Sequence, residues 1–409
     1  MSAFRPEILA PAGDFSVFLT AIKYRADAIY LGGKELNLRA KAKGFSWEEL
    51  NKALNIAKEK NIKVYFCLNV FPKQKHIPKI KETLNRLKDI NIDAVIISDP
   101  GVVDFAIQTI PEIPIHLSTQ ANTTNSLAVN FWKKIGIKRI NLARELSHLE
   151  IYKIRKEHQD IELEVFVHGA MCLSYSGRCL LSEYLNKRHA NLGLCTQPCR
   201  YQYKIVEAWL EEKTRPGKVL WRVIEEDEFS EILSCEDLCL VRFLNWFIKN
   251  RIDALKIEGR TKTSSYVGPV VDVYKSALEA ILNKEKFDYK LYLTELLKTT
   301  SRDFSTGFFL YPKKLEIPVK DEIKRYPILA QVISKVKEDK WLVEVKHRWF
   351  AKDSFEILIP GLKRSVVNSK EYKLENQEGL TVDVLHSGQK GFLRCDSPYL
   401  EEYILLRRI

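Results

Sequence analysis

The 409-residue sequence lacks several features that define large classes of protein. No apolar run approaches the roughly 18 residues that a bilayer-spanning helix needs. The first residues, MSAFRPEILAPAG, contain no apolar signal-peptide core. We therefore expect a cytosolic protein without a membrane partner. In a reducing compartment, the eight cysteines are expected to be metal ligands, catalysts or core side chains rather than disulfides.

Three catalytic signatures are also missing. The HExxH motif of zinc proteases and the GxSxG elbow of serine hydrolases are both absent. The compact C-x3-C-x2-C of radical adenosylmethionine enzymes is absent too, so the cysteines do not by themselves imply cleavage of that cofactor. Cys172 and His168 form the one tempting nucleophile–base pair, but Cys172 is better explained as a metal ligand. The residues therefore argue against a protease.

What the sequence does contain is a repeat of short apolar runs separated by amphipathic stretches. Such alternation predicts a parallel sheet covered by helices. Asp14, Ser46 and Ser147 are expected N-caps, and Ser46 has Glu49 three residues later, as in a capping box. A doubly wound open sheet is the alternative, but no GxGxxG follows the first run, and eight units match a (β/α)8 barrel. The eight runs cover residues 7–12, 27–33, 62–69, 92–99, 113–120, 137–144, 162–169 and 252–260.

The predicted domains follow from this count. Residues 1–285 are expected to form an α/β TIM-like barrel, with an insertion over 170–250 after the seventh strand. Because this insertion follows the carboxyl end of a strand, it is expected over the catalytic face. Residues 286–325 are predicted as a linker. Period-two strands over 326–409 predict a small closed C-terminal β-barrel.

The insertion holds six of the cysteines. Four have the spacing Cys172-x6-Cys179-x15-Cys195-x3-Cys199. Four thiolates in two close pairs can hold tetrahedral zinc or an iron–sulfur cluster, and the long x6 gap favours the cluster. Cys235 and Cys239 are expected in the core, with one of them an alternative fourth ligand.

Polar residues at the ends of the predicted strands are expected to face the active site. Three arginines from separate loops, Arg39, Arg144 and Arg260, suit a dianionic ligand because guanidinium binds carboxylate or phosphate bidentately. For any one of them, a salt bridge across the barrel top is an equal alternative. The full set is Arg39, Asn69, Asp99, His116, Ser118, Gln120, Arg144, Glu145, His168, Lys256, Glu258 and Arg260.

The formal net charge is +12, and basic residues interleaved with tyrosines gather beside the cysteines. Basic side chains neutralise phosphates and aromatic rings stack on unpaired bases, so this pattern favours RNA over an ordinary solvated surface. The residues singled out for RNA contact are Arg178, Tyr184, Lys187, Arg188 and Arg200.

The run ELEVFVHGAMCLSYSGRCLLS resembles the signature of the collagenase-like peptidase family U-32. The blocks EILAPAGD, YLGG, HLSTQ, NLAREL, GLCTQPCR and LKIEGRTK agree, from residue 5 to about 310. Residues 326–409 resemble the β-barrel that ends members of this family. RPGKVLWRVIEEDEF, SCEDL and KIEGRTKT are most similar to its tRNA-hydroxylation branch.

The resemblance implies a hydroxylase that forms 5-hydroxyuridine at the tRNA wobble position, with the anticodon arm as partner. It implies a 4Fe–4S cluster on Cys172, Cys179, Cys195 and Cys199, and prephenate as an oxygen-independent contributor. On this hypothesis the three arginines hold a carboxylated donor, with Gln120 and Lys256 beside it, and His116, His168 and Glu258 transfer protons.

Two alternatives stay open at this point. One is the proteolysis that the family name implies. The other is a cluster-bearing partner of a hydroxylase that acts on ribosomal RNA or ubiquinone precursors, with a paralogous family member as a further possible partner.

Overall fold

The computed structural model describes most of the chain: residues 4–34, 43–171, 174–175, 179, 181–188, 195–200, 236–300, 302–311, 316–317 and 326–409. Arg39, Cys172, Arg178 and Cys235 lie outside the described residues, as do the side chains of Tyr184 and Arg200.

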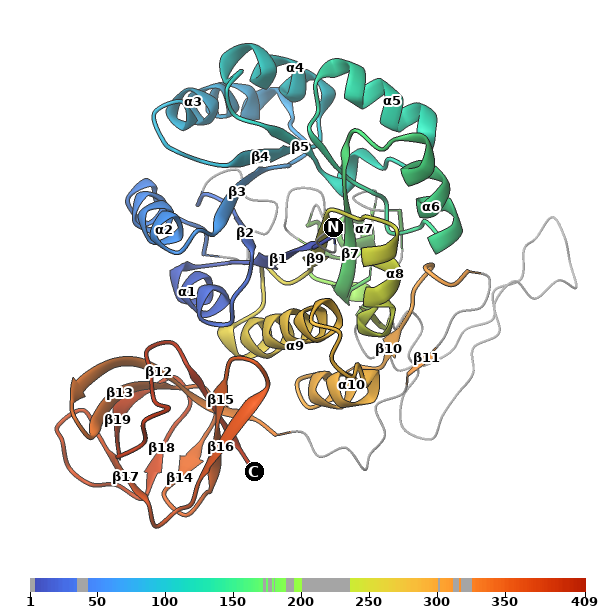
Figure 1. Cartoon of the computed structure of the whole chain (residues 1–409). Helices are drawn as coiled ribbons and strands as arrows, with labels where there is room; N and C mark the ends of the chain where they lie inside the picture. The colour runs from blue at the N-terminus through green and yellow to red at the C-terminus, as the bar shows by residue number, and fades with distance from the viewer. Residues whose placement is uncertain are drawn as a thin grey trace, which may run out of the picture.

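Eight parallel strands close into a barrel, as predicted (Figure 1). Neighbours along the chain pair in parallel, and β9 closes the ring by pairing with both β1 and β7. Most residues in the middle of these strands are apolar, which suits strands that are covered on both faces of the sheet. The strands are β1 (Glu7–Pro11), β2 (Ala28–Leu31), β3 (Lys63–Leu68), β4 (Ala94–Ile97), β5 (Ile115–Leu117), β6 (Arg139–Asn141), β7 (Glu162–Ala170) and β9 (Ala254–Ile257).

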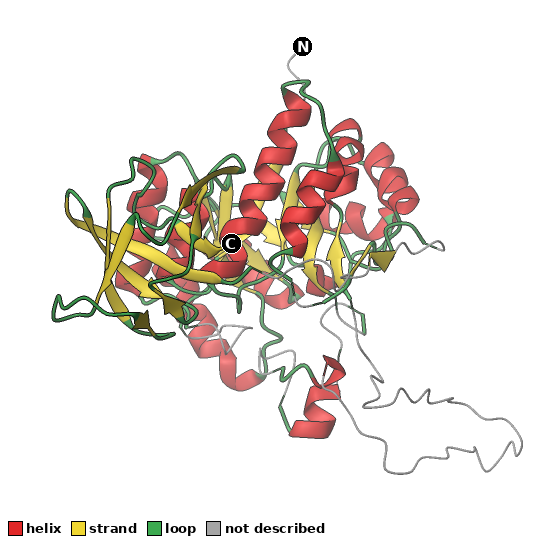
Figure 2. Ribbon diagram, turned by 90° about the horizontal axis from the view of Figure 1, so that it is seen from below, coloured by secondary structure: helices red, strands yellow, loops and turns green. Residues whose placement is uncertain are grey.

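Helices surround the barrel (Figures 1 and 2). Asp14, Ser46 and Ser147 cap α1, α2 and α6 as predicted, and the last two form capping boxes. No helix in the described part of the chain is long and apolar enough to cross a membrane. The helices are α1 (Phe15–Lys23), α2 (Trp47–Glu59), α3 (Ile77–Leu87), α4 (Pro100–Thr109), α5 (Ser126–Ile135), α6 (His148–Glu157), α8 (Leu244–Lys249), α9 (Ser264–Leu282) and α10 (Tyr289–Leu297).

The insertion after β7 ends at a strand that pairs with the end of β7. The end of β7 continues past the barrel and pairs with β8 (Asp237–Cys239), which runs antiparallel to it. Strand β10 (Phe304–Ser305) extends this edge and pairs in turn with β11 (Glu316–Ile317). Within the insertion, the described elements are α7 (Leu181–Asn186) and the 3-10 turn Pro198–Arg200. The segment predicted as a linker, 286–325, therefore contains α10, β10 and β11.

The C-terminal domain is a curled antiparallel sheet, a half-barrel, around its own apolar core. Strands β16 and β17 stand at its two edges, so the small β domain is confirmed, and its form is a half-barrel rather than a closed one. The seven strands of the main sheet are β12 (Ile328–Lys337), β13 (Lys340–Val345), β15 (Phe355–Ile359), β16 (Lys363–Val367), β17 (Tyr372–Glu375), β19 (Lys390–Cys395) and β20 (Leu405–Arg408), and β14 (Trp349–Phe350) pairs with β18 (Val384–Leu385).

The half-barrel packs on α1, α9 and α10 (Figure 1). The hydroxyl of buried Tyr24 donates to the Leu358 carbonyl (2.9 Å) and accepts from the Leu405 amide (3.1 Å). Glu295 of α10 pairs with Arg364 (2.8 Å) and Arg407 (2.6 Å) of the half-barrel. Buried, directional contacts of this kind fix one domain orientation more firmly than a polar surface contact does.

Candidate active site at the barrel mouth

The carboxyl ends of the barrel strands present a connected group of polar side chains. The Asn69 amide, after β3, donates to the Ser118 hydroxyl after β5 (3.1 Å). The Ser98 hydroxyl, after β4, donates to the Asn69 carbonyl (3.2 Å). Since three neighbouring strand ends are joined in this way, the predicted convergence on the mouth is present in the structure. Asp99 has a different place, because its carboxylate caps α4 by accepting from the Val102 amide.

Arg144 and Arg260 bring positive charge to the same end of the barrel. The Arg144 guanidinium donates to the carbonyl of Ala170 (2.6 Å) and lies over the Phe166 ring, 4.1 Å from its centroid. Arg144 is therefore fixed against the carboxyl end of β7, where the cysteine insertion begins. Arg260 follows Glu258 after β9, and both are buried. A buried guanidinium is costly unless a partner neutralises it.

Several buried polar atoms around the mouth have no hydrogen-bond partner within the described residues. Such atoms cost about 1–3 kcal/mol each unless a ligand or water satisfies them. The group includes both acceptors and cationic donors, so a ligand with both hydrogen-bonding and anionic groups would complement it. The atoms are Asn69 Oδ1, Gln120 Oε1, Asn122 Oδ1, Thr123 Oγ1, Asn141 Oδ1, Arg144 Nε and Arg260 Nη1.

The opposite half of the barrel interior contains a paired ion network. Arg139 of β6 binds Glu7 (2.8 Å), and Lys256 of β9 binds Glu164 (2.6 Å). Arg139 is 3.7 Å from Glu164, which joins the two pairs. Burial alone would raise the pKa of Glu7, but the Arg139 charge outweighs it and holds that pKa below its usual value. The amino group of Lys256 is thus engaged with Glu164 below the mouth, which argues against its predicted role in substrate binding.

His116 lies next to this network rather than at the rim. Its ring packs edge-on against Tyr65, 4.7 Å between centroids, and is 6% exposed. Burial lowers its pKa well below the usual value, and the charges of Arg139 and Lys256 add to the effect. His116 is therefore neutral at pH 7 and can act there as an acceptor or a neutral donor.

The structure corrects the expectation that His168 faces the mouth. The pairing of β7 with β9 slips between Phe166 and His168, a β-bulge that turns the strand. The His168 ring contacts Tyr274 of α9 and Phe304 of β10, both outside the barrel. Burial lowers its pKa to about 3, with a smaller contribution from the Lys262 charge. His168 is a core histidine, which argues against its predicted role in proton transfer.

Gly169 follows this bulge with φ +106°, a conformation that glycine adopts readily. A Cβ there would come within 2.7 Å of the Glu258 carbonyl. Gly169 therefore lets the end of β7 approach the segment that bears Glu258 and Arg260.

In the described parts of the insertion, the segment that follows Cys179 contacts the segment that follows Cys195. The Ser182 hydroxyl, three residues after Cys179, accepts from the amide of Thr196, the residue after Cys195 (3.0 Å). The Gln197 amide donates to the Cys195 sulfur (3.3 Å), a contact typical of sulfur ligands in clusters. Cys179, Cys195 and Cys199 are half-buried.

No three His, Cys, Asp or Glu side chains within the described residues are gathered closely enough to hold a metal ion. The fourth predicted ligand, Cys172, lies outside those residues. The fit of an iron–sulfur cluster therefore rests on the four-cysteine donor set and on the hydrogen bond between Ser182 and Thr196. Cys239 is not part of it. It is buried beside Tyr274, and burial raises its pKa to about 12, which keeps the thiol protonated and fits core packing.

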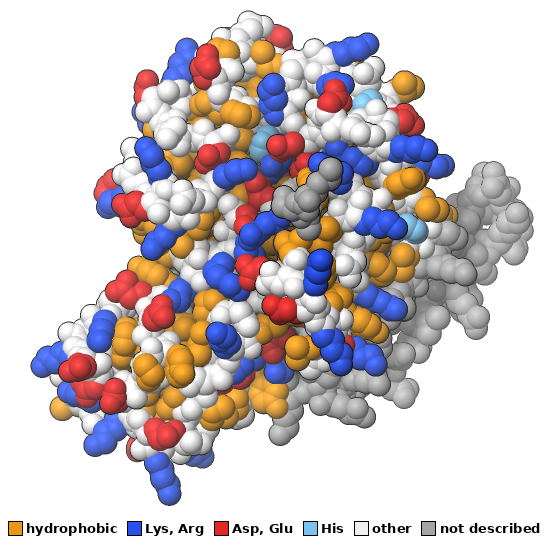
Figure 3. Space-filling view, in the orientation of Figure 1, with side chains coloured by type: hydrophobic (Ala, Val, Ile, Leu, Met, Phe, Trp, Pro, Cys, Tyr) orange, Lys and Arg blue, Asp and Glu red, His pale blue; other side chains and the backbone are white. Residues whose placement is uncertain are grey.

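Two of the predicted RNA-contacting residues are described, Lys187 and Arg188 just after α7. Lys187 is exposed and Arg188 is half-buried. On the face shown in Figure 3, Lys and Arg are interspersed with Asp and Glu over both domains rather than gathered into one patch. The net positive charge therefore does not by itself mark an RNA-binding face.

Residues 13–317 match the model of peptidase family U32. The chain belongs to this family. It is 38% identical over 307 residues to tRNA hydroxylation protein P1 of Bacillus subtilis, covering 75% of this chain and 71% of that protein. It is 32% identical over 423 residues to tRNA hydroxylation protein P of Escherichia coli, covering 92% and 90%. It is 30% identical over 317 residues to a protein of Porphyromonas gingivalis named Collagenase, covering 74% and 73%.

Sequence reasoning missed two groups of polar residues in the barrel. Asn122, Thr123 and Asn141 lie close to strand ends and carry unpaired atoms, but small polar residues in loops are too common to stand out. The ion network at the other end was also missed. Its signal was present, because charged residues inside apolar strands, such as Arg139 and Glu164, need a buried partner.

Proposed function

We propose that this member of family U32 is an RNA hydroxylase that converts the tRNA wobble uridine to 5-hydroxyuridine. The observation that carries the proposal is the buried guanidinium of Arg260 after β9, together with buried acceptors after other barrel strands that have no partner among the described residues. That arrangement suits an anionic co-substrate held beside a nucleobase. The names of the two tRNA hydroxylation relatives support RNA as the substrate class.

In this proposal Arg260 and Arg144 bind the carboxylates of an oxygen donor, for which prephenate is the candidate. Guanidinium matches carboxylate in a bidentate geometry. The oxygen of Gln120 or of Asn122 would accept from the single N–H on the base-pairing edge of uracil. The target base must leave the anticodon stack to reach them, as for other enzymes that act on a base.

Glu258 and neutral His116 are the proposed groups for moving the proton released from the base. Glu258 is buried directly after β9, beside Arg260 in sequence, and His116 lies deeper in the barrel. A carboxylate at the mouth can accept a proton at neutral pH. His116, which carries no charge there, can hydrogen-bond the donor without repelling Arg260.

Cys172, Cys179, Cys195 and Cys199 would hold a 4Fe–4S cluster, which would supply electron transfer close to the mouth. Arg144 supports this location, because its hydrogen bond to Ala170 fixes the strand end that leads into the cysteine segment. The same arginine would then orient both the oxygen donor and the start of the insertion.

The test is mass spectrometry of tRNA nucleosides from a strain lacking this protein and its paralogues. Wild-type protein should restore 5-hydroxyuridine, whereas Cys195→Ala and Arg260→Met should not. Cys67→Ala is the matched control, because Cys67 is buried in β3 and should be dispensable. Unchanged 5-hydroxyuridine in the deletion strain would contradict the proposal. New loss of a hydroxylated ribosomal nucleoside or of ubiquinone would favour the alternative substrates.

Peptidase activity is the competing proposal, because one relative is named Collagenase. The described Cys239 and His168 do face each other across β8 and β7. Their pKa values, about 12 and about 3, are the reverse of what a thiolate–imidazolium pair requires. Pure protein should therefore leave gelatin uncut, and cleavage that survives Cys195→Ala would favour the peptidase.

A further inference from the structure

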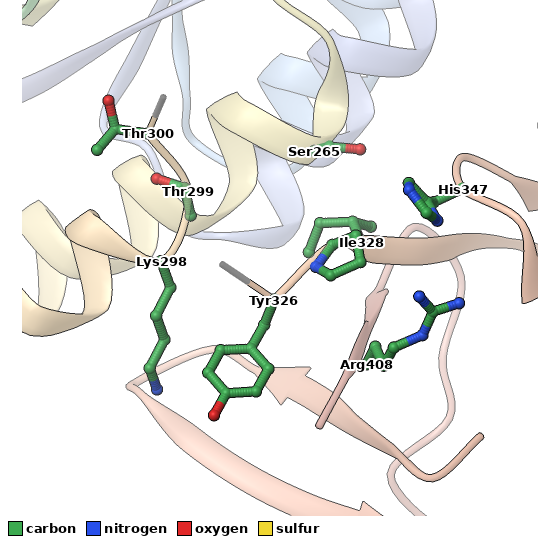
Figure 4. A pocket seen from close by; sticks show the side chains of 9 residues that line it. Ser265, Lys298, Thr299, Thr300, Tyr326, Ile328, His347 and Arg408 are labelled. Carbon is green, nitrogen blue, oxygen red and sulfur yellow. The ribbon is translucent and has the colours of Figure 1, made fainter. Parts of the chain in front are cut away.

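A cleft of about 510 Å³ lies between the barrel helices and the half-barrel (Figure 4). Its size falls within the range of roughly 300–1,000 Å³ that holds small molecules or nucleotide-sized groups. The lining includes three basic side chains, one tyrosine and three hydroxyls, and no carboxylate among the residues that the structure describes. The residues are Ser265, Lys298, Thr299, Thr300, Tyr326, Pro327, Ile328, His347 and Arg408.

The cleft adjoins the barrel mouth. Ser265 lies in the first turn of α9, and the same short segment carries Glu258 and Arg260 at the end of β9. Thr300 follows the end of α10 and leads into β10, which pairs with β8 beside the end of β7. A polymer bound at the mouth could therefore continue into the cleft without crossing the molecule.

The walls of the cleft are held in place by the domain interface. Lys298 follows α10, and its ammonium pairs with Glu295 (3.0 Å), which also binds Arg364 and Arg407 of the half-barrel. Asp272 of α9 accepts a hydrogen bond from the Gly361 amide of the half-barrel (2.7 Å). Because buried charges link both sides, the cleft is preformed, and a ligand pays little ordering cost on entering it.

The side chains that line the cleft are of the kinds that bind single-stranded RNA. In Figure 4, Lys298 and Tyr326 lie together on one side, and His347 and Arg408 lie on the other. The Lys298 ammonium is 5.9 Å from the Tyr326 ring centroid. Arg408 pairs with Asp353 (2.9 Å), which steadies the arginine, and its Nε has no partner in the described structure.

We propose that this cleft binds the RNA strand next to the target nucleotide. Lys298, His347 and Arg408 would contact phosphates, and Tyr326 would stack on a base or ribose. This inference rests on the proposed function. It adds that the half-barrel takes part in RNA binding through its junction with the barrel.

The test measures binding of a fluorescent anticodon stem–loop RNA by the full chain at several salt concentrations. Lys298→Gln should weaken binding about threefold to tenfold at 0.1 M salt, as expected for one lost phosphate contact, and reduce the slope of log affinity against log salt by about 0.7. Tyr326→Ala should weaken binding about fivefold or more with the salt slope unchanged, because stacking releases no counterions.

A matched control exists at the other end of the barrel. Lys58 is exposed beside a second cleft of about 270 Å³, lined also by Asn61 and Asp93. Lys58→Gln removes the same charge and should leave affinity and salt slope unchanged. In the wild type, a 4-thiouridine cross-link from the stem–loop should map to the peptide around Tyr326, not to that around Asn61.

The outcomes separate the two levels of the proposal. If the wild-type chain binds the stem–loop no better than an unrelated hairpin, the proposed function itself fails. If the wild type binds but Lys298→Gln, Tyr326→Ala and Lys58→Gln all behave alike, the cleft inference is overturned while RNA hydroxylation stands.

Discussion

The two ends of one barrel treat buried polar groups in opposite ways. At the amino-terminal end, Glu7, Arg139, Glu164 and Lys256 are matched in charge and in contact. At the carboxyl end, Arg260 is just as buried, but its Nη1 has no partner among the described residues. In the first arrangement each charge lies beside an opposite charge, although Glu164 Oε2, 3.7 Å from Arg139, makes no hydrogen bond within the described residues. Among the described residues, the second therefore leaves a buried hydrogen-bond donor that a ligand could satisfy.

This difference separates stability from function within a single fold. A buried ion network repays its desolvation only when all members are present, so its residues are needed for folding. Groups left unpaired lower stability, and they are retained where a ligand satisfies them. Variants at the base should therefore unfold the protein, and variants at the mouth should disable it. Four substitutions test this contrast, from the largest expected effect to the smallest.

Arg139→Met should have the largest effect, on stability. It leaves Glu7 and Glu162 without the guanidinium that each of them binds, at a cost of about 3–5 kcal/mol. Urea denaturation followed by circular dichroism measures the loss. Lys63→Met is the control, since that exposed side chain also contacts Glu7 (3.1 Å) and should cost less than 1 kcal/mol. Equal effects of the two variants would show that the network is not what stabilises the base.

Arg260→Met should have the reverse profile. Loss of a charged contact to the co-substrate costs about 1.5–3 kcal/mol, which lowers the rate of hydroxylation about 10–100-fold. The midpoint of urea unfolding should stay the same or rise, because the substitution removes Nη1, a buried donor without a hydrogen-bond partner among the described residues. Arg260→Lys should recover only part of the rate, since an ammonium cannot bind bidentately. A destabilised but active Arg260→Met protein would place this residue with the base instead.

His168→Phe should change only the pH dependence of stability. The folded-state pKa of about 3 lies below the unfolded value of about 6.5, so the unfolded chain takes up the proton first. Stability conferred by neutral His168 is therefore lost as pH falls from about 6.5 toward 3, by about 1.4 kcal/mol per pH unit. The stability of His168→Phe should lack this fall with pH, and the variant should retain hydroxylation. His386→Phe, at an exposed position, should show the same slope of stability against pH as the wild type. Loss of activity in a folded His168→Phe protein would show that His168 has a catalytic role.

Gln120→Leu should have the smallest effect. Its unpaired Oε1 is a neutral acceptor, so losing a hydrogen bond to the base costs about 0.5–1.5 kcal/mol. The rate of hydroxylation should fall about threefold to tenfold, with no loss of stability. Single-turnover rates on stem–loop RNA provide the measurement. If the rate is unchanged, Gln120 lies outside the base-binding part of the mouth.

The fold could be predicted from the sequence because its signals are local. Apolar runs such as residues 63–68 and caps such as Ser46 and Ser147 are readable within a few residues, and all eight barrel strands fall where they were expected. The half-barrel was predicted as closed. Whether its edge strands meet depends on curvature, which no short segment specifies.

The candidate site was only partly predictable. A residue's place at a strand end indicates its level along the barrel axis, but not whether its side chain points into the barrel or outward. His168 ends a barrel strand as predicted, yet one extra residue in β7 directs it outward. Lys256 was predicted to face the active site and bind substrate, but it pairs below the mouth with Glu164, from a strand about ninety residues earlier. Pairings at that distance along the chain depend on how the barrel closes.

The antiparallel pairing of β7 with β8 has a consequence for how this architecture varies. Ala170 and Asp237 are partners in that ladder, so the chain leaves the barrel and returns to it at adjacent points. Everything between them is topologically a single hairpin loop, and closing such a loop costs only slowly more as it lengthens. The cysteine-bearing segment can therefore be shortened, exchanged or grafted as one unit, and a short turn joining Ala170 to Asp237 would give a barrel without that segment.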